Sequence, residues 1–206
     1  MRILVACEES QAVTIAFRNA GHEAYSCDIQ ECSGGHPEWH IQGDAVAEAY
    51  SGKYDMMIAH PPCTYLSNAG AVRLYPQKGQ LNKDRYLMGL DGKDFFMKIL
   101  NAPIKKVAVE NPTPSKIFEL PKESQVIQPF QFGHPYSKRT LLWLVGLPLL
   151  VPTNILDEYK PFISSNTGGK KRGQKHHIGI AKSAKDRSKT FPGIAQAMAE
   201  QWGGLS

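Results

Sequence analysis

The chain has 206 residues, of which 42% are hydrophobic and 21% are charged, and its formal net charge is +5 at pH 7. This ordinary composition excludes a fibrous, repetitive or low-complexity chain, and the length supports one substantial core. We therefore expect a single domain over residues 1–206. The positive surplus is mild and favours polyanionic partners only weakly.

The cysteine pattern and the lack of long apolar runs indicate a cytoplasmic protein without membrane contact. Glu8 and Glu9 interrupt the only early apolar run, so no secretory signal is visible. No stretch approaches the roughly 20 apolar residues that span a bilayer. Thiols stay reduced in the cytoplasm, and a cysteine there can serve chemistry rather than structure.

The beginning of the chain predicts a strand, a helix and a second strand. Residues 2–6 form the apolar run of a buried parallel strand. Residues 9–19 carry apolar side chains at helical spacing, and Gly21 stands where such a helix would end. Residues 23–27 are typical of a second strand, which ends at Asp28. This order is the start of a doubly wound α/β sheet.

The rest of the chain continues the alternation of strands and helices. Glycines, prolines and polar residues mark loops at 30–39 and 67–80. The further elements that we expect are a helix at 45–50, a strand at 54–59, a helix at 91–100, strands at 106–109 and 140–145, and a helix at 193–202. The predicted fold is α/β and Rossmann-like, a doubly wound, mostly parallel sheet with its ligand site at the carboxyl ends of the strands.

The segment at residues 60–67, His-Pro-Pro-Cys-Thr-Tyr-Leu-Ser, follows the predicted strand at 54–59 directly. Two successive prolines fix φ twice and remove two donors, which gives the strand a stiff exit. Cys63 is then presented on a rigid turn at the ligand-binding edge. The alternative is a partly buried structural thiol, which is the commoner role of a cysteine.

A second candidate segment, Glu110-Asn111-Pro112, follows the next predicted strand. A carboxylate at a strand end can hydrogen-bond a ring nitrogen, and it can exchange a proton when it is desolvated. Taken alone, this tripeptide more often simply ends a strand. Its position one strand after Cys63 favours a shared site.

Together the two segments resemble the motifs of the cytosine carbon-5 DNA methyltransferases. Pro61-Pro-Cys63-Thr-Tyr-Leu-Ser67 resembles that family's Pro-Pro-Cys-Gln-x-Phe-Ser motif, and Glu110-Asn111 resembles its Glu-Asn-Val motif. The chain is especially similar to short, phage-type members of the family. That similarity runs over most of the chain and includes residues 128–139 and 190–203.

The resemblance implies methyl transfer from S-adenosylmethionine to carbon 5 of cytosine in DNA. The Cys63 thiolate would add to carbon 6 of the ring, while Glu110 hydrogen-bonds or protonates nitrogen 3. Carbon 5 would then attack the methyl group, and loss of the carbon-5 proton would expel Cys63. Arg139 resembles an arginine of the family's Gln-x-Arg-x-Arg motif that contacts cytosine oxygen 2, although it is equally well a solvated basic residue before a strand.

The resemblance also implies a cofactor pocket at the ends of the first strands. Asp28 would bind the ribose hydroxyls, and Asp44 would meet the adenine amino group unless it only caps a helix. The helix that begins near Glu9 would offer backbone N–H groups to the methionine carboxylate. The full set of expected cofactor-binding residues is Cys7, Glu8, Glu9, Ser10, Asp28, Ile29, Asp44, Ala45 and Pro61.

The first motif departs from the family pattern. The family has Phe-x-Gly-x-Gly, whereas residues 6–11 here contain no glycine to permit a positive φ or a close backbone approach. Glu8 and Glu9 also place negative charge near the cofactor carboxylate, unless one of them engages the cofactor's amino group. The closing motif at 190–199 lacks the usual asparagine and fits a plain core helix equally well.

The substrate side of the site is expected to combine the two motifs with a basic segment. A flexible segment at about 154–189 stands where full family members carry a target-recognition domain. Such a run is usually only a solvated loop, but beside a cleft it suits an arm that contacts DNA phosphates. The expected substrate-binding residues are Pro62, Ser67, Asn111, Pro112, Lys170, Lys171 and Arg172.

Several alternatives remain open at this point. The substrate is duplex DNA with a flipped base, single-stranded DNA, or a free pyrimidine nucleotide. The missing glycines favour a further possibility, a catalytically inactive DNA-binding relative. Cys27, Cys32, His36 and His40 match no firm zinc spacing, and we expect no metal. A phage origin would place the protein in the cytoplasm of a bacterial host, and the oligomeric state does not follow from the sequence.

Overall fold

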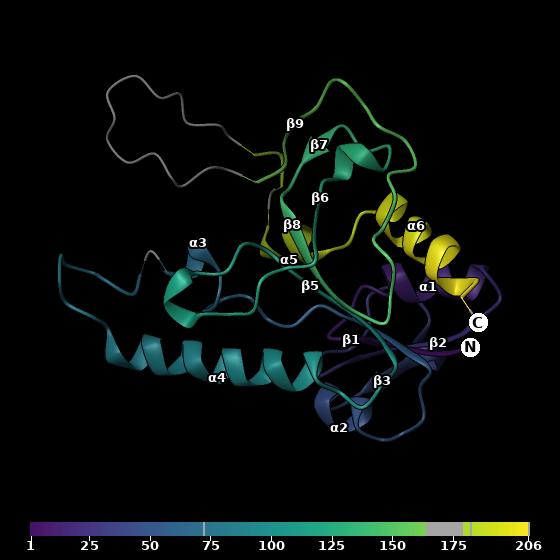
Figure 1. Cartoon of the computed structure of the whole chain (residues 1–206), viewed down its shortest axis with the longest axis horizontal. Helices are drawn as coiled ribbons and strands as arrows, with labels where there is room; N and C mark the ends of the chain where they lie inside the picture. The colour runs from purple at the N-terminus through teal and green to yellow at the C-terminus, as the bar shows by residue number, and fades with distance from the viewer. Residues whose placement is uncertain (72, 164–178, 182, 206) are drawn as a thin grey trace.

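A seven-stranded sheet forms the centre of the computed structural model, which describes residues 1–71, 73–163, 179–181 and 183–205 (Figure 1). The strand order is β3-β2-β1-β4-β5-β8-β6. Its strands are β1 (Arg2–Ala6), β2 (Glu23–Asp28), β3 (His40–Gln42), β4 (Met56–Ala59), β5 (Lys106–Asn111), β6 (Gln125–Ile127) and β8 (Thr140–Val145). The first five strands of the order are parallel, and β8 runs antiparallel to both β5 and β6.

Helices cover both faces of this sheet. The helices are α1 (Ala12–Asn19), α2 (Ala45–Ala49), α3 (Asn68–Ala71), α4 (Lys83–Leu100), α5 (Ala184–Ser188) and α6 (Pro192–Gly203). Helices α1 and α6 pack together on one face, and α2 and α4 pack together on the other (Figure 1). Short 3-10 turns are η1 (Pro37–Trp39), η2 (Lys116–Phe118) and η3 (Pro129–Gln131), and β7 (Tyr136–Ser137) pairs with β9 (Lys160–Pro161).

The alternation of side chains along each strand divides the core into two layers. In β1, Ile3 and Val5 belong to the layer under α1 and α6, whereas Leu4 and Ala6 belong to the layer under α2 and α4. Both sets are fully buried, because a parallel strand covered by helices on both faces has no solvent side. The doubly wound, mostly parallel α/β fold predicted from the sequence is confirmed.

The chain order switches direction between β1 and β4, which lie side by side in the sheet. Open α/β sheets bind ligands in the crevice outside the carboxyl ends of the strands at such a point. The segments that leave β1 and β4 at this edge begin with Cys7 and His60. The fold therefore places the His-Pro-Pro-Cys segment where a ligand site is expected.

Two predicted helices have different starts in the structure. Helix α1 begins at Ala12 rather than near Glu9, because Gln11 adopts a left-handed conformation with φ +58°. Helix α4 begins at Lys83, eight residues before the expected residue 91, with Asn82 as its N-cap. Its first turns lack apolar periodicity, since large side chains such as Leu87 are exposed and Gly89 takes a buried position against Phe118.

The strands also differ from the prediction at two places. Residues 40–42, for which no element was predicted, form the short edge strand β3. Strand β5 continues to Asn111, so Glu110 and Asn111 lie within the strand rather than after it, paired with Leu142 and Leu141 of β8. The antiparallel partner extends the ladder beyond the apolar run. None of the helices described has both the length and the apolar character that crossing a bilayer requires.

Candidate active site

The turn that carries Cys63 is anchored to both neighbouring strands. The backbone N–H of His60 donates to the carbonyl of Ala6 in β1 at 2.9 Å. The carbonyl of Pro61 accepts a 3.0 Å hydrogen bond from Nδ2 of Asn111, whose side chain comes from β5 and is buried. A prolyl pair with these two anchors has little freedom to move. The turn therefore holds the backbone that carries Cys63 in a fixed position.

A buried ion pair joins the two motif segments. Nδ1 of His60 lies 2.9 Å from Oε2 of Glu110, and the two side chains are only 10% and 12% exposed. Burial favours the neutral imidazole, but the hydrogen bond and charge of Glu110 raise the pKa of His60 above its ordinary value. Burial likewise opposes ionisation of Glu110, yet His60 and the nearby Lys138 hold the pKa of Glu110 below its ordinary value.

Cys63 and Glu110 interact electrostatically across this site. Burial raises the pKa of the half-buried Cys63 thiol, and the charge of Glu110 raises it further. The positive charges of Lys138 and Arg187 act in the opposite direction. The resting thiol is therefore protonated, and its acidity depends on the charge that Glu110 carries.

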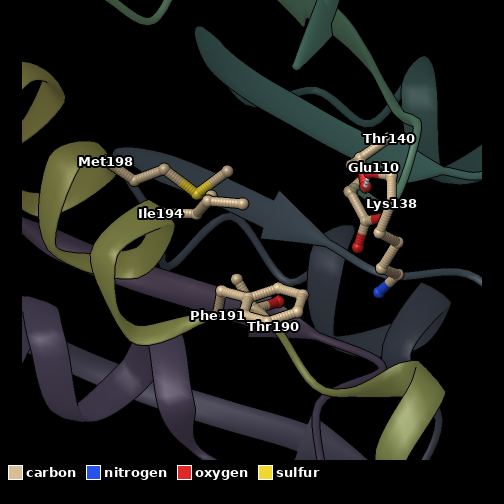
Figure 2. A pocket seen from close by; sticks show the side chains of 7 residues that line it. All are labelled: Glu110, Lys138, Thr140, Thr190, Phe191, Ile194 and Met198. Atoms are coloured by element: carbon tan, nitrogen blue, oxygen red, sulfur yellow. Dashed lines mark hydrogen bonds between the residues drawn. The ribbon is translucent and has the colours of Figure 1, made fainter. Parts of the chain in front are cut away.

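A pocket opens in front of Glu110, between the β5–β8 edge and helix α6 (Figure 2). Glu110, Lys138 and Thr140 line one side of it, and apolar groups from Phe191, Ile194 and Met198 line the other, together with Thr190. The residues predicted at 190–199 thus do more than fill the core, because the start of α6 forms a wall of this pocket. The pocket therefore has an apolar wall that faces a carboxylate and an ammonium.

Lys138 and Arg139 are adjacent basic residues just before β8. The half-exposed guanidinium of Arg139 lies 3.7 Å from Glu123. Lys138 lines the pocket together with Glu110. That Arg139 contacts the base stays a prediction, and Lys138 is a second basic candidate beside it.

The ends of β1, β2 and β3 gather the acidic residues that were expected to hold the cofactor. The backbone N–H of Gly43 donates to the carbonyl of Asp28 at 2.9 Å, which brings Asp28 beside Asp44. Burial raises the pKa of Cys7 to about 12, and the charges of Asp28 and Asp44 contribute to the rise. Cys7 and both aspartates thus lie in electrostatic contact at one edge of the sheet.

The predicted cofactor residues Asp28 and Asp44 both make local hydrogen bonds. Asp28 uses Oδ1 to accept from the N–H of Gln30, and the next residue, Ile29, has an apolar side chain that is 77% exposed. Asp44 caps α2 by accepting from Val46 and Ala47 through Oδ1, so the helix-cap alternative is confirmed as one of its roles.

The glycine-free first motif still makes the sharp turn that glycines usually permit. Cys7 and Gln11 both have φ +58°, a conformation that costs a non-glycine residue roughly 1–3 kcal/mol. Gln11 is fully buried and offsets this cost with hydrogen bonds, since its side chain donates to the carbonyl of His36 at 2.8 Å and accepts from the His36 N–H at 3.0 Å. The missing glycines therefore did not prevent the turn.

The N-terminus of α1 is occupied by the protein's own carboxylate. Glu8 accepts hydrogen bonds from the N–H of Val13 at 2.7 Å and from the N–H of Thr14 at 3.2 Å, and also from the Thr14 hydroxyl at 2.7 Å. Burial raises the pKa of Glu8, and these three donors oppose the rise. The N–H groups that were expected to bind the methionine carboxylate are thus already used by Glu8, which corrects that part of the prediction.

S-adenosylmethionine therefore suits one part of this edge and not another. Asp28, Ile29 and Asp44 match its ribose and adenine, and the acidic surroundings match its cationic ammonium and sulfonium groups. The carboxylate of the methionine moiety would need a partner other than the amides of Val13 and Thr14. A methyltransferase cofactor with these groups would bring a methyl group bound to a cationic sulfur to the switch point of the sheet.

The remaining predicted residues take varied positions. Glu9, Ser10 and Pro112 are half-buried, Pro61, Ser67 and Ala45 are buried, and Pro62 is exposed. Lys170, Lys171 and Arg172 lie outside the described residues. Among the described residues, no three histidine, cysteine or acidic side chains are grouped in a way that could hold a metal ion.

Sequence reasoning missed two members of the site, His60 and Lys138. Both stood within segments that attracted notice, next to Pro61 and next to Arg139. No local sequence pattern pairs His60 with a carboxylate fifty positions away. Which of the adjacent residues 138 and 139 faces the pocket depends on the register with which the chain enters β8, and the sequence does not give that register.

No protein-family model matches the chain, and no curated protein matches it either. Similar solved structures include a putative DNA modification methyltransferase encoded within a prophage of E. coli, with 11% identity and a TM-score of 0.46, covering 76% of this chain and 52% of that one. A second is the S. pombe Dnmt2 methyltransferase, with 16% identity and a TM-score of 0.43, covering 72% of this chain and 50% of that one. A third is the Entamoeba histolytica methyltransferase EhMeth, with 12% identity and a TM-score of 0.46, covering 76% of this chain and 57% of that one. The chain spans about half the length of these proteins. The three solved structures named here are methyltransferases by their descriptions.

Proposed function

We propose that this chain transfers a methyl group from S-adenosylmethionine to carbon 5 of cytosine in DNA, through a temporary bond between Cys63 and the ring. One observation carries the proposal. A cysteine on a rigid turn and a buried carboxylate from the neighbouring strand share one site, and the 3.0 Å hydrogen bond from Asn111 to Pro61 fixes their relative position. Covalent addition to a pyrimidine needs a nucleophile and a proton-holding group in this relation.

The chemistry assigned to these side chains balances in protons and bonds. The Cys63 thiol would give its proton to solvent and its sulfur would bond to carbon 6 while Glu110 holds a proton at nitrogen 3. Carbon 5 would then be electron-rich enough to take the methyl group as the bond from that group to the cofactor's sulfonium sulfur breaks and leaves a neutral thioether. Loss of the carbon-5 proton to solvent and return of the nitrogen-3 proton to Glu110 then break the bond to sulfur. An aromatic carbon is a poor nucleophile without such addition, which is why the thiol is required.

The electrostatics of the site connect substrate binding to activation of the thiol. Apart from burial, the negative charge of Glu110 opposes ionisation of Cys63 in the resting protein. A ring that shares a proton with Glu110 would neutralise this charge. Lys138 and Arg187 would then stabilise the thiolate with less opposition. The nucleophile would thus form when the substrate is in place.

A cytosine base in DNA is the substrate that the proposal favours. The net charge of +5 and the ammonium of Lys138 at the pocket suit a phosphate-bearing ligand. A free pyrimidine nucleotide would use the same two residues, with only a small phosphate pocket. Neutral substitutions of Lys170, Lys171 and Arg172 would separate the two cases, because binding to a polymer of phosphates depends on the number of basic contacts far more than binding to a single nucleotide does.

A second candidate function has its own supporting observation. The Glu8 carboxylate at the start of α1 occupies the amides that an S-adenosylmethionine carboxylate would otherwise use. This favours a relative of the methyltransferases that binds DNA without methylating it. Titration calorimetry with S-adenosylmethionine separates the candidates, because the second one predicts no detectable binding at millimolar cofactor.

Covalent trapping tests the proposal directly. The full chain is incubated with S-adenosylmethionine and a duplex of mixed sequence in which cytosines are replaced by 5-fluorocytosine, whose fluorine cannot leave as a proton does. We expect a cofactor-dependent complex that survives a denaturing gel, and none with Cys63→Ser, while that variant keeps its cofactor affinity. A complex that still forms with Cys63→Ser, or no complex with the wild-type chain, would refute the proposal. Methylation of dCMP, but not of DNA, would assign the free-nucleotide activity instead.

A further inference from the structure

We propose that His60 is a positioning residue that also stores the proton used at this site, passing it to Glu110 when a pyrimidine ring enters and taking it back when the product leaves. This inference rests on the proposed function and goes beyond it. A carboxylate that must hold a proton at ring nitrogen 3 needs a source for that proton. His60 is the titratable group in direct hydrogen-bond contact with Glu110.

The geometry of the pair defines which atom would carry the proton. An ionised carboxylate only accepts hydrogen bonds, so the 2.9 Å contact requires a proton on Nδ1 of His60. Both side chains are nearly nine-tenths buried or more, and the water that normally exchanges protons has little access to them. The proton between Nδ1 and Oε2 is therefore held locally and can be shared along a short, charge-assisted bond.

The other ring nitrogen keeps its proton throughout the transfer. Nε2 of His60 is buried and has no hydrogen-bond partner among the residues that the structure describes. The unpaired Nε2–H is present both in the imidazolium and in the neutral ring that remains after Nδ1 gives up its proton, so its cost is the same in both states. The transfer therefore depends on the bond between Nδ1 and Oε2.

The charges around the pair are close to balanced when His60 is protonated. Glu8 after β1 and Glu110 on β5 act on the ring as negative charges, and Lys138 before β8 acts on both His60 and Glu110 as a positive charge. Cys63 on the turn is influenced by Glu110 and by the positive charge of Arg187 in α5. At the imidazole ring itself two carboxylates act against one lysine, and this excess of negative charge favours the imidazolium.

The transfer balances over one catalytic cycle. At rest the proton lies on Nδ1 of His60 and Glu110 is ionised. As the ring binds, the proton moves from Nδ1 to Oε2 and on to nitrogen 3, leaving His60 neutral, with Nε2 now carrying the ring's single proton. When the bond to Cys63 breaks, nitrogen 3 returns its proton through Glu110 to Nδ1. No external acid is needed for the addition step.

A matched variant separates proton storage from positioning. His60→Asn places an amide N–H where Nδ1 stands, so it keeps a hydrogen bond to Glu110 but has no proton to give. We expect kcat for DNA methylation to fall about a hundredfold or more, while KM for DNA and for cofactor changes less than about twofold. His22→Asn, at the opposite end of β2, serves as the control and should leave both constants unchanged.

The pH dependence of activity is a second measurement, and it would not change if His60 had only a structural role. Wild-type activity should stay level below the raised pKa of His60, where the proton is stored, and should fall only as pH rises through that pKa. In His60→Asn the proton must come from water to Glu110, so activity should rise steadily as pH falls from 8 to 6. A His60→Asn variant with wild-type kcat and an unchanged profile would overturn the inference.

Ring NMR of the substrate-free protein tests the same idea without turnover. The His60 resonance, identified by its absence in His60→Asn, should titrate above the ordinary histidine value and move down in Glu110→Gln. A His60 ring that is neutral at pH 6, or that ignores Glu110→Gln, would overturn proton storage even if DNA methylation is established. Conversely, failure of the wild-type 5-fluorocytosine trap counts against the proposed function, so the two failures are distinguishable.

Discussion

The two halves of the carboxyl edge of the sheet are built very differently. At the ends of β4 and β5, beside the start of β8, the side chains of His60, Glu110 and Asn111 are largely buried and hydrogen-bonded across strands. At the ends of β2 and β3, by contrast, Ile29 is largely exposed and Asp44 is held mainly by its own helix. We call the first group the closed half, and the group of Asp28, Ile29 and Asp44 the open half.

The two halves meet different requirements, one for groups that act on a reacting atom and one for groups that bind a cofactor. Groups that act on a reacting atom have to be held in place before the ligand arrives, since their value depends on preorganisation. Groups that hold a cofactor have to remain accessible, since the cofactor must enter and leave. The substitutions below test whether the closed half controls rate and the open half controls affinity.

Glu110→Gln should have the largest effect. Without the carboxylate nothing can pass a proton to ring nitrogen 3, and we expect methylation of DNA to fall by about 10²–10⁴-fold. The affinity for S-adenosylmethionine should stay within about twofold, because Glu110 lies in the other half of the edge. A variant that lost cofactor binding and rate together would show that the two halves do not act separately.

The same substitution has a predicted pH signature in stability. Because the pKa of His60 is raised, this residue stabilises the folded state at pH values below the ordinary histidine pKa near 6.5, and the stabilisation is lost as pH rises through the raised pKa. Because the pKa of Glu110 is lowered, this residue stabilises the folded state at pH values above the ordinary glutamate pKa of about 4.3, and the stabilisation is lost as pH falls through the lowered pKa. Urea unfolding of wild type and Glu110→Gln should therefore differ most near pH 5–6, by about 2 kcal/mol, and less at pH 8. A difference that grows towards pH 8 would contradict this sign.

Lys138→Ala and Arg139→Ala form a matched pair that comes next in size. Lys138 lines the pocket beside Glu110, and its loss should reduce kcat/KM for DNA by about 10–100-fold. Arg139 makes only a half-exposed contact with Glu123, so its loss should change kcat/KM less than about threefold. The reverse order of effects would indicate that Arg139 is the residue that contacts the base.

Asp28→Asn tests the open half by itself. Loss of one charged hydrogen-bond acceptor should weaken S-adenosylmethionine binding about tenfold by calorimetry, with kcat at saturating cofactor nearly unchanged. The free energy of unfolding should stay within about 0.5 kcal/mol, since Asp28 makes only a local hydrogen bond with Gln30. Unchanged cofactor affinity would exclude Asp28 from the pocket.

Glu8→Gln should have the smallest functional effect, and in the opposite direction. Removing the negative charge from the start of α1 should strengthen cofactor binding a few-fold, because it no longer repels the methionine carboxylate. The same change loses one helix-capping acceptor and should lower stability by about 1 kcal/mol. Weaker cofactor binding would instead indicate that Glu8 engages the amino group of the cofactor.

The sequence predicted the structure correctly wherever a local pattern is compatible with only one kind of local structure. Apolar runs such as residues 3–6 can be buried only as core strands, and a strand followed by Pro61 and Pro62 can leave only as a stiff turn. Order along the chain then placed Cys63 and Glu110 at neighbouring strand ends, and Glu110 acts electrostatically on Cys63 in the structure. The sheet was accordingly predicted from the residues, and the catalytic roles of Cys63 and Glu110 stay predictions.

Only the tertiary structure decided which side chains complete the site. The pairing of His60 with Glu110 depends on the register between β4 and β5, and the inward position of Lys138 depends on the phase with which the chain enters β8. Glu8 binds the start of α1 because Gln11 is left-handed, a conformation that no local pattern demanded. Local preferences act over a few residues, whereas these contacts join strands that meet only when the whole sheet has formed.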